Sequence, residues 1–524
     1  MTICREGIVA TSQTLASQAG AQALARGGSA MDAAIVANIV LAVVEPMSCG
    51  VGGDLFAMYR ARADGRVSGI NASGWSPREL TIERAGGQLD GIHSVTVPGC
   101  VDGWARLHRR FGRLPWRELF SAAVHYAEEG FPVTEIVAAH WRNLEPKLMA
   151  SRDARQVYLI GGRAPEAGEV FRSPAMARTL KVLAGNGPDA FYRGPIGQAL
   201  LATCRDHGGL MCREDLAEFE SEWVDPISTT YRGWDIYELP PNGQGLAALE
   251  MLNILEQFPL HQYGARSADT LHLKIEAQKL AYQDLKAYLA DPRLSRVPVP
   301  SLISKEYARE RASSIDLRGA RGDYGPGTPA PDGDTVYLCA VDREGNIASL
   351  IQSIYQGFGS GIVVPAYGFA LHNRGALFSL DPAHPNALAG RKRPFHTIIP
   401  GLMQMGDRCV GFGIMGGYNQ AQAHAQLVSN VVDHGMNLQA ALEAPRFTKL
   451  TFGGRDLLME SRFPAETLDQ LRAMGHEIAT VGEFSSFMGG GQAVMHDALS
   501  GVNYGASSPR KDGAAIPEPM WRGL

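Results

Sequence analysis

The amino-acid sequence predicts a turn-rich α/β protein, and three observations support that prediction. Hydrophobic residues make up 45% and charged residues 20% of the 524 residues, which is typical of a globular chain with a large core. Glycine accounts for 60 residues, about 11% against a usual ~7%, so tight turns are frequent. Stretches with helical periodicity alternate with short β-branched and aromatic runs, which predicts both helices and strands.

The charge balance and the apolar runs exclude several classes of protein. The chain has 49 basic and 54 acidic residues, and its densest basic run is only Arg391 to Arg393, so we expect no nucleic-acid and no membrane partner. The longest apolar run, Ala33 to Val44, is about 12 residues, short of the ~20 that span a bilayer. The first residues show no secretory signal, and the seven scattered cysteines include no CxxC pair. We therefore expect a cytoplasmic location and no disulfide framework.

The first third of the chain predicts two helices followed by a hairpin. An alanine-rich helix over Leu15 to Arg26 ends at two glycines, and Ser29 can cap a second helix over Ala30 to Val44. Strands over Asp54 to Arg62 and Arg66 to Asn71 flank a short turn. From about residue 94 to residue 290 the pattern is mainly helical, with strand-like interruptions.

The sharpest compositional break lies at Arg321 to Asp334, where ten of fourteen residues are Gly, Pro or Asp. Such a segment cannot form a regular element. It stops at Thr335, which opens a strand to Asp342, and a second strand follows over Ile347 to Ser353. A flexible tether thus leads into a hairpin whose first residue is threonine.

A threonine in this position has the placement that an N-terminal nucleophile requires. If the chain is cut between Asp334 and Thr335, the freed α-amine has an ordinary pKa of about 7.7–8.0 and can act as the base for the neighbouring hydroxyl. One residue would then supply both nucleophile and base. An exposed linker that enters an ordinary edge strand has the same composition and is more common, so the spacing alone does not establish self-cleavage.

A second candidate feature is the turn at Gly416 and Gly417. It lies between a predicted strand, Cys409 to Ile414, and a predicted helix, Asn419 to Val432. Two glycine N–H groups at a helix start could stabilise an oxyanion, although a close-packing turn uses glycine pairs in the same way.

Other motifs are weaker. The stretch Pro46 to Gly50 lacks the first glycine of a serine-hydrolase elbow, and Gly357 to Gly361 lacks a phosphate-loop spacing. The histidines show no metal-binding spacing, so His372 and His396 are interpreted as satisfied polar or substrate-facing groups, and no metal or cofactor is expected.

Several stretches together resemble the γ-glutamyltranspeptidase family of N-terminal nucleophile hydrolases, and their order and spacing cover nearly the whole chain. The matching stretches are residues 27–34, 45–46, 50–53, 97–99, 111–116, 129–131, 335–342 with Asn346, 358–362, 392–394, 415–417, 444–447 and 505–510.

The resemblance implies a four-layer αββα sandwich of two intertwined pieces, a large subunit of residues 1–334 and a small subunit of residues 335–524. These form a heterodimer from one precursor, and a dimer of such heterodimers is compatible with the resemblance. It implies that Thr335 is the nucleophile and α-amine base, that Gly416 and Gly417 form the oxyanion hole, and that Ser353, where the family has a threonine, supports self-cleavage. Val336 replaces the second threonine of the family's usual pair.

The sequence departs from the family where the glutamyl end is held. Ser73 stands in place of the arginine that binds the α-carboxylate, Leu377 and Tyr355 in place of an aspartate and an asparagine that hold the α-ammonium, and Arg374 in place of a glutamine. A serine pair is replaced by His396 and Thr397. Because losing a buried charge partner costs about 2–5 kcal/mol, γ-glutamyl specificity is not expected.

The remaining groups suit an anion without an amino group, since Arg374 with His372 or His396 could hold a carboxylate. Within the family this favours the amidase that converts oxamate to oxalate and ammonia in purine-nitrogen salvage. An apolar pocket shaped by Tyr355, Phe395 and Leu377 for a bulkier acyl amide is the open alternative, with Arg374 paired internally. A glutathione hydrolase or γ-glutamyltransferase, and a non-catalytic member of the family, are the further alternatives.

Overall fold

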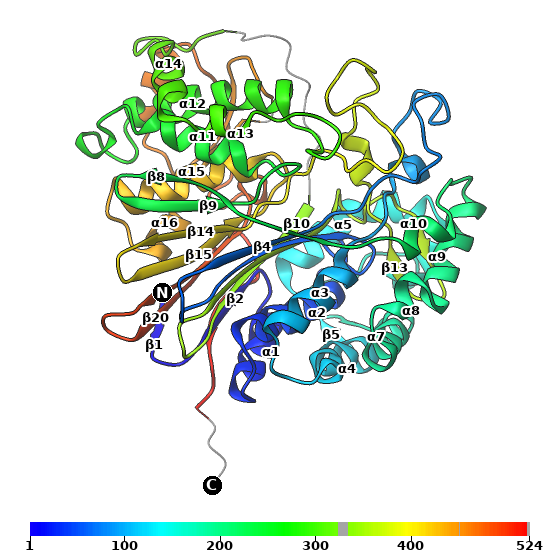
Figure 1. Ribbon diagram of the computed structural model, residues 1–524. Coiled ribbons are helices and arrows are strands. Elements are labelled where there is room, and N and C mark those ends of the chain that lie inside the picture. The colour runs from blue at the N-terminus through cyan, green and yellow to red at the C-terminus, as the bar shows by residue number, and fades with distance from the viewer. Residues whose placement is uncertain (323–333, 450, 521–524) are drawn as a thin grey trace.

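The structure is a computed structural model that describes residues 1–322, 334–449 and 451–520. Two seven-stranded antiparallel sheets lie face to face between two layers of helices (Figure 1). The fold is therefore the predicted four-layer αββα sandwich. Most of the predicted tether, residues 323–333, lies outside the described residues.

The first sheet has the strand order β1-β20-β19-β15-β14-β9-β8. In that order its strands are Thr2–Cys4, Val502–Ser507, Gly491–Asp497, Arg408–Ile414, Gly401–Met405, Trp234–Glu238 and Ile227–Tyr231. The second sheet has the order β21-β2-β10-β11-β3-β4-β7. Its strands are Ala514–Pro517, Ile8–Thr11, Asp334–Val341, Ile347–Tyr355, Asp54–Arg60, Val67–Ala72 and Glu222–Val224.

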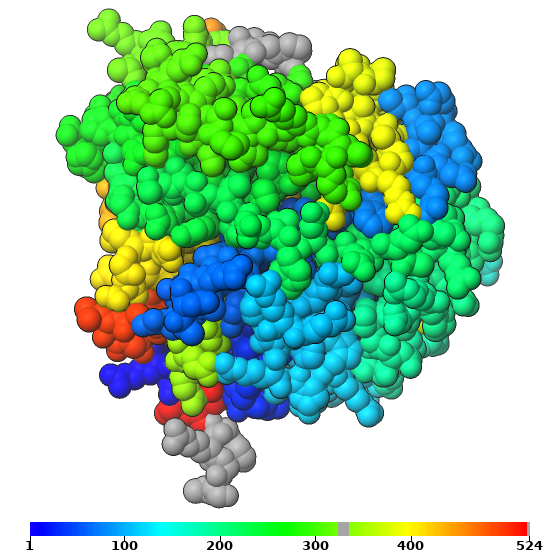
Figure 2. Space-filling model, viewed as in Figure 1, coloured from blue at the N-terminus to red at the C-terminus, as the bar shows by residue number. Residues whose placement is uncertain are grey.

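Each sheet combines strands from both sides of residue 335. Strand β10 pairs with β2 on one edge and β11 on the other, and β11 pairs in turn with β3. Surface segments from the two parts of the chain also adjoin one another on one face of the molecule (Figure 2). The two parts share one fold because neither would complete a sheet alone.

A helical layer covers the outer face of the second sheet. Its helices are α1 Thr14–Ala25, α2 Ala30–Val44, α3 Cys100–Phe111, α4 Ser121–Glu129, α5 Glu135–Met149, α6 Arg152–Tyr158, α7 Pro174–Asn186, α8 Asp189–Tyr192, α9 Pro195–Asp206 and α10 Arg213–Ala217. Helix α2 is buried along its whole length and begins with a capping box between Ser29 and Asp32. The predicted bounds of this helix are confirmed.

The other helical layer covers the first sheet. It contains α11 Gly245–Leu255, α12 Ala268–Tyr288, α13 Val299–Leu302, α14 Lys305–Ser313, α15 Asn419–Val432 and α16 Leu438–Glu443. Helix α17, Ala465–Ala473, packs beside a small sheet of β16 Phe447–Thr448, β17 Asp456–Glu460 and β18 Glu477–Val481. Two further two-stranded pairs are β5 Phe131–Pro132 with β6 Val170–Phe171, and β12 Val363–Val364 with β13 Phe369–Ala370.

The apolar core between the two sheets brings the ends of two strands together. Tyr337 on β10 packs directly over Gly413 on β15, where a Cβ would lie only 2.5 Å from the tyrosine ring. Thr335 is the second residue of β10, and Gly416 lies two residues after Ile414, the last residue of β15. The close contact between the sheets thus places the predicted nucleophile and the predicted oxyanion turn in the same region of the sandwich.

Candidate active site

Thr335 lies at an irregularity in the pairing of β10 with β11. Asp334 pairs with Tyr355 and Val336 pairs with Gln352, so Ser353 and Ile354 both face the single residue Thr335. Such bulges re-aim side chains and are frequent beside active sites. The Thr335 side chain is buried, with 1% of its surface exposed.

Ser353 is the hydrogen-bonding centre of the site. The Thr335 hydroxyl donates to Ser353 Oγ at 3.2 Å, the Tyr355 N–H donates to it at 2.8 Å, and an Arg374 guanidinium nitrogen donates at 3.0 Å. Tyr355 has φ +74°, a conformation uncommon outside glycine, and its N–H is held by this bond. The structure therefore brings three of the predicted site residues onto one serine oxygen.

Arg374 is fully buried at the start of the 3-10 turn Arg374–Leu377. It donates to Thr397 Oγ1 at 2.7 Å as well as to Ser353, and its guanidinium carbon lies 4.5 Å from the centre of the Tyr355 ring. Burial lowers the pKa of Arg374 to about 10, while the charge of Asp54 opposes that shift. Arg374 therefore stays cationic at neutral pH, with its hydrogen bonds made to neutral hydroxyls.

Asp54 completes the site, and sequence reasoning missed it. Its Oδ2 lies 2.9 Å from His396 Nε2 and 3.6 Å from His372 Nδ1, and its Oδ1 accepts the Gly74 N–H at 3.1 Å. The pKa of Asp54 is lowered, because the nearby cationic and hydrogen-bonding groups outweigh the opposing effect of burial. The only local signal for Asp54 is a carboxylate at the first position of a buried strand.

The two histidines contact Asp54 rather than Arg374. His396 Nδ1 accepts the Ile398 N–H at 3.3 Å, so its Nε2 carries the proton and donates to Asp54. His372 Nε2 lies 2.9 Å from the Thr96 carbonyl oxygen and therefore donates to it. Burial lowers the pKa of His396 to about 3 and also lowers the pKa of His372, so both are neutral at pH 7.

The glycine turn at Gly416 and Gly417 has a left-handed backbone, and its predicted role as the oxyanion hole stays a prediction. Gly416 has φ +126° and Gly417 φ +57°, and within the described part of the chain neither N–H donates to a protein acceptor. Gln244 Nε2 donates to the Gly417 carbonyl at 2.8 Å and also to the Thr397 carbonyl. One amide thereby links the turn to the residue that binds Arg374.

Ser73 occupies a neighbouring but separate position. Its hydroxyl donates to Asn71 Oδ1 at 2.7 Å, and Asn242 Nδ2 donates to Ser73 Oγ at 3.2 Å. Ser73 is next to Gly74, which binds Asp54. The predicted substrate contact of Ser73 stays a prediction.

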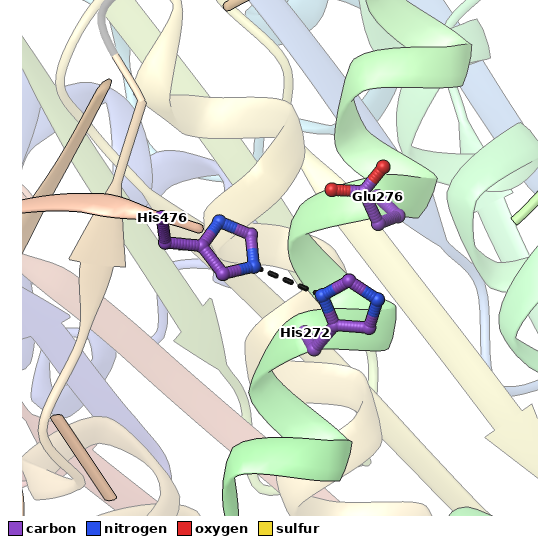
Figure 3. A group of neighbouring side chains, drawn as sticks. All are labelled: His272, Glu276 and His476. Atoms are coloured by element: carbon purple, nitrogen blue, oxygen red, sulfur yellow. Dashed lines mark hydrogen bonds between the residues drawn. The ribbon is translucent and has the colours of Figure 1, made fainter. Parts of the chain in front are cut away.

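One cluster has metal-ligand chemistry, at a distance from these residues. His272, Glu276 and His476 are buried, and their potential ligand atoms lie within 4.8 Å of one another (Figure 3). His272 Nε2 faces the Asp316 carbonyl at 2.8 Å and is protonated, so Nδ1 accepts from His476 Nε2 at 2.9 Å. Lys279 Nζ contacts Glu276 at 2.6 Å. The cluster is best explained as a hydrogen-bonded anchor for the chain near Asp316.

The sandwich of two antiparallel sheets, with a buried threonine near the start of one of its central strands, is typical of the class of N-terminal nucleophile hydrolases. The γ-glutamyltranspeptidase family model matches residues 16–518, and the chain belongs to that family. It is a hydrolase that acts on amide bonds.

Similar proteins have several different activities. The chain is 35% identical to the glutathione hydrolase-like YwrD proenzyme of Bacillus subtilis, covering 97% of this chain and 98% of that protein. It is 36% identical to the oxamate amidohydrolase proenzyme of Klebsiella pneumoniae, covering 98% of both. The crystal structure of a cephalosporin acylase from Bacillus halodurans superposes with a TM-score of 0.93 at 42% identity, covering 100% of this chain and 97% of that one.

Among the described residues, none of the helices is both long enough and apolar enough to span a membrane.

Proposed function

We propose that this protein is a self-cleaving threonine amidohydrolase that hydrolyses a small carboxylate-bearing amide, with oxamate as the substrate and oxalate and ammonia as the products. The observation that carries the proposal is the buried Arg374 cation, one serine hydroxyl away from Thr335. The oxamate amidohydrolase of Klebsiella pneumoniae, similar over 98% of both chains, supports the same substrate class.

Self-cleavage begins when the Thr335 hydroxyl attacks the Asp334 carbonyl carbon. The acyl group moves from nitrogen to oxygen, and water hydrolyses the resulting ester to release the large subunit 1–334 and the small subunit 335–524. Ser353 orients the hydroxyl for this attack through the 3.2 Å bond. The proenzyme names of similar proteins support a precursor that is cut.

In the cleaved enzyme the α-amine of Thr335 takes the proton from its own hydroxyl, which attacks the substrate amide carbonyl. The N–H groups of Gly416 and Gly417 stabilise the oxyanion, the amine returns the proton to the departing ammonia, and water hydrolyses the acyl-threonine ester. Within the described residues these two N–H groups donate to no protein acceptor, which supports this role.

The position of Arg374 favours a carboxylate attached directly to the reacting carbonyl carbon. The two hydrogen bonds through Ser353 place a guanidinium nitrogen no more than about 6 Å from Thr335 Oγ1. In oxamate the carboxylate is bonded to the carbonyl carbon, which suits that separation. The α-carboxylate of a γ-glutamyl group lies several bonds further away and brings an ammonium that needs a counter-ion of its own.

An acylase that acts on bulkier amides is the second candidate. It is favoured by a stack of Phe395 on Tyr418, with ring centres 5.3 Å apart, because Tyr418 directly follows the glycine turn. The superposition with a cephalosporin acylase supports it as well. In this arrangement the Arg374 charge would be balanced inside the protein.

Intact mass spectrometry of the purified protein, with an ammonia-release assay on oxamate, tests the proposal. We expect two pieces split before Thr335 and release of ammonia, and Thr335→Ala should abolish both. A cleaved and active Thr335→Ala variant would overturn the nucleophile assignment. Cleavage without turnover of oxamate, but with turnover of a bulky acyl amide, would favour the acylase.

A second measurement isolates the carboxylate contact. Oxamide replaces the carboxylate of oxamate by a neutral amide of the same shape. Arg374→Lys keeps the charge but loses the planar fork, and we expect it to raise the KM for oxamate about tenfold or more while changing the KM for oxamide little. Equal effects on both substrates would refute a direct contact between Arg374 and the carboxylate.

A further inference from the structure

A cavity of about 340 Å³ is lined by residues of α12, α15 and α16. These helices belong to the layer that covers the first sheet (Figure 1). No residue that lines it belongs to the site around Thr335. One part of its wall is apolar, formed by residues such as Leu271 and Met436. The volume is at the lower end of the range for small-molecule sites.

A buried lysine lines this cavity without a counter-ion. Lys274 on α12 is only 4% exposed, and its Nζ donates to Asn430 Oδ1 over a long 3.4 Å. In the described parts of the chain no carboxylate lies within 4.0 Å of that nitrogen. Burial lowers the pKa of Lys274 to about 8, so the amine is mostly charged at pH 7.

A neighbouring lysine shows how this fold satisfies a buried cation. Lys279, five residues further along α12, is equally buried, but its Nζ lies 2.6 Å from Glu276 Oε1 and 3.1 Å from the Arg321 carbonyl. The acid that stabilises the Lys274 charge is Asp433, which does not contact it directly. Both carboxylate oxygens of Asp433 already accept hydrogen bonds, one from Arg232 and one from Tyr231. The Lys274 ammonium therefore lacks the direct acidic partner that a buried cation needs.

The remaining charges at the cavity favour an anion. Arg266 and Arg462 line it together with Lys274, and Glu443 is the single acid among the lining residues. Glu443 accepts from Gln439 at 2.8 Å, and Arg462 contacts Glu460 at 2.9 Å. A cation would meet three positive side chains, whereas a carboxylate would meet a desolvated ammonium.

We propose that this cavity binds a small organic carboxylate, with the carboxylate on Lys274 Nζ and the apolar part of the ligand against Leu271 and Met436. An inorganic anion would leave most of the cavity and its apolar wall unfilled. The site is separate from the proposed active site, and its occupancy does not depend on Thr335.

Titration calorimetry with benzoate tests this site, with benzyl alcohol as the matched neutral ligand. We expect the full-length protein to bind benzoate measurably and benzyl alcohol at least tenfold more weakly. Lys274→Met should weaken benzoate binding by tenfold or more, because a charge-assisted hydrogen bond is lost. It should not lower the melting temperature, since it replaces a buried charge with an apolar chain of similar length.

Lys286→Met is the control, because it removes a positive charge from the same helix twelve residues away, about 18 Å along the axis. It should leave benzoate affinity unchanged. Ala440→Phe, which fills the cavity from α16, should abolish binding even if Lys274→Met does not fold. Absence of benzoate binding by the unmodified protein, or binding by the Lys274→Met and Ala440→Phe variants as tight as that of the unmodified protein, would overturn the proposal.

Discussion

Removing the Ser353 hydroxyl tests the centre of the proposed active site. Ser353→Ala leaves the Thr335 hydroxyl, the Tyr355 N–H and one Arg374 N–H without their common acceptor, in a site that is fully buried. A buried donor that loses its hydrogen bond without a replacement costs about 1–3 kcal/mol, and because some of these donors keep or find other acceptors, the expected loss of stability is about 3–5 kcal/mol. A nucleophile displaced by about 1 Å loses about 10²-fold in rate.

We therefore expect Ser353→Ala to slow self-cleavage and to lower kcat for oxamate by about 10²-fold each. Cleavage is followed by the appearance of the two pieces on a denaturing gel, and kcat by ammonia release from whatever fraction is cleaved. Ser353→Thr keeps the hydroxyl and should retain both activities. The matched control is Ser349→Ala, which removes a buried hydroxyl from the same strand, 2.8 Å from the Tyr337 hydroxyl.

Ser349→Ala should cost about 1 kcal/mol of stability and leave cleavage and kcat unchanged. If Ser353→Ala cleaved itself and turned over oxamate at the rates of the unmodified protein, the hydrogen bond to Thr335 would have no role in orienting the nucleophile. If both serine variants lost activity equally, the effect would come from the strand rather than from the contact with Thr335.

Two further predictions concern the surroundings of the site. The pKa of His396 is about 3 when folded against ~6.5 unfolded, so unfolding takes up a proton between these pH values and stability falls as the pH drops through that window. The free energy of unfolding, measured with urea at several pH values from 4 to 6.5, should therefore rise less steeply with pH in His396→Gln, by up to about 1.4 kcal/mol per pH unit. An unchanged pH dependence would contradict this. A Cβ on Gly489, at φ +69°, would lie 1.8 Å from the Met415 carbonyl oxygen, so Gly489→Ala should shift the neighbouring turn at Gly416 and Gly417. If that turn is the oxyanion hole, as proposed, kcat should fall at least tenfold. Gly435→Ala, at φ +63° with open space around it, should cost only about 1 kcal/mol; equal kcat in both glycine variants would show that the turn tolerates the shift.

Local signals were sufficient for the elements that carry the predicted nucleophile and oxyanion turn. Helix α15 begins at Asn419 and ends at Val432 as predicted, because a glycine turn precedes it and alanine and valine residues recur along it. Strand β10 begins at Asp334, one residue before the predicted start, and β11 continues two residues past Ser353. The bulge at Thr335 accounts for the longer β11 strand, and no periodicity in the sequence indicates it.

Asp54 was not predictable in the same way, because its role depends on contacts far away in the sequence. His372 and His396 lie more than 300 residues beyond it, on irregular segments that follow β11 and precede β14. The substitutions in the sequence suggest that His372 or His396, together with Arg374, holds a substrate carboxylate, and the structure places both histidines against the Asp54 carboxylate. A buried strand residue with a charge is the one local indication, since an unpaired carboxylate would not be buried there.

The charge arrangement around Arg374 supports the proposed substrate carboxylate. Asp54 lowers the electrostatic cost of burying Arg374, but its hydrogen bonds go to His396 and Gly74, and those of Arg374 go to Ser353 and Thr397. Both histidines are neutral, so the charges of Asp54 and Arg374 cancel. Asp54 and Arg374 do not hydrogen-bond to each other. The Arg374 Nε has no hydrogen-bond partner among the described residues, and a substrate carboxylate would give the guanidinium an acceptor with the opposite charge. A neutral acyl group would not offset the remaining cost of burying the guanidinium. The proposed preference for a small anionic amide is therefore supported by the absence of a direct hydrogen bond between Arg374 and Asp54.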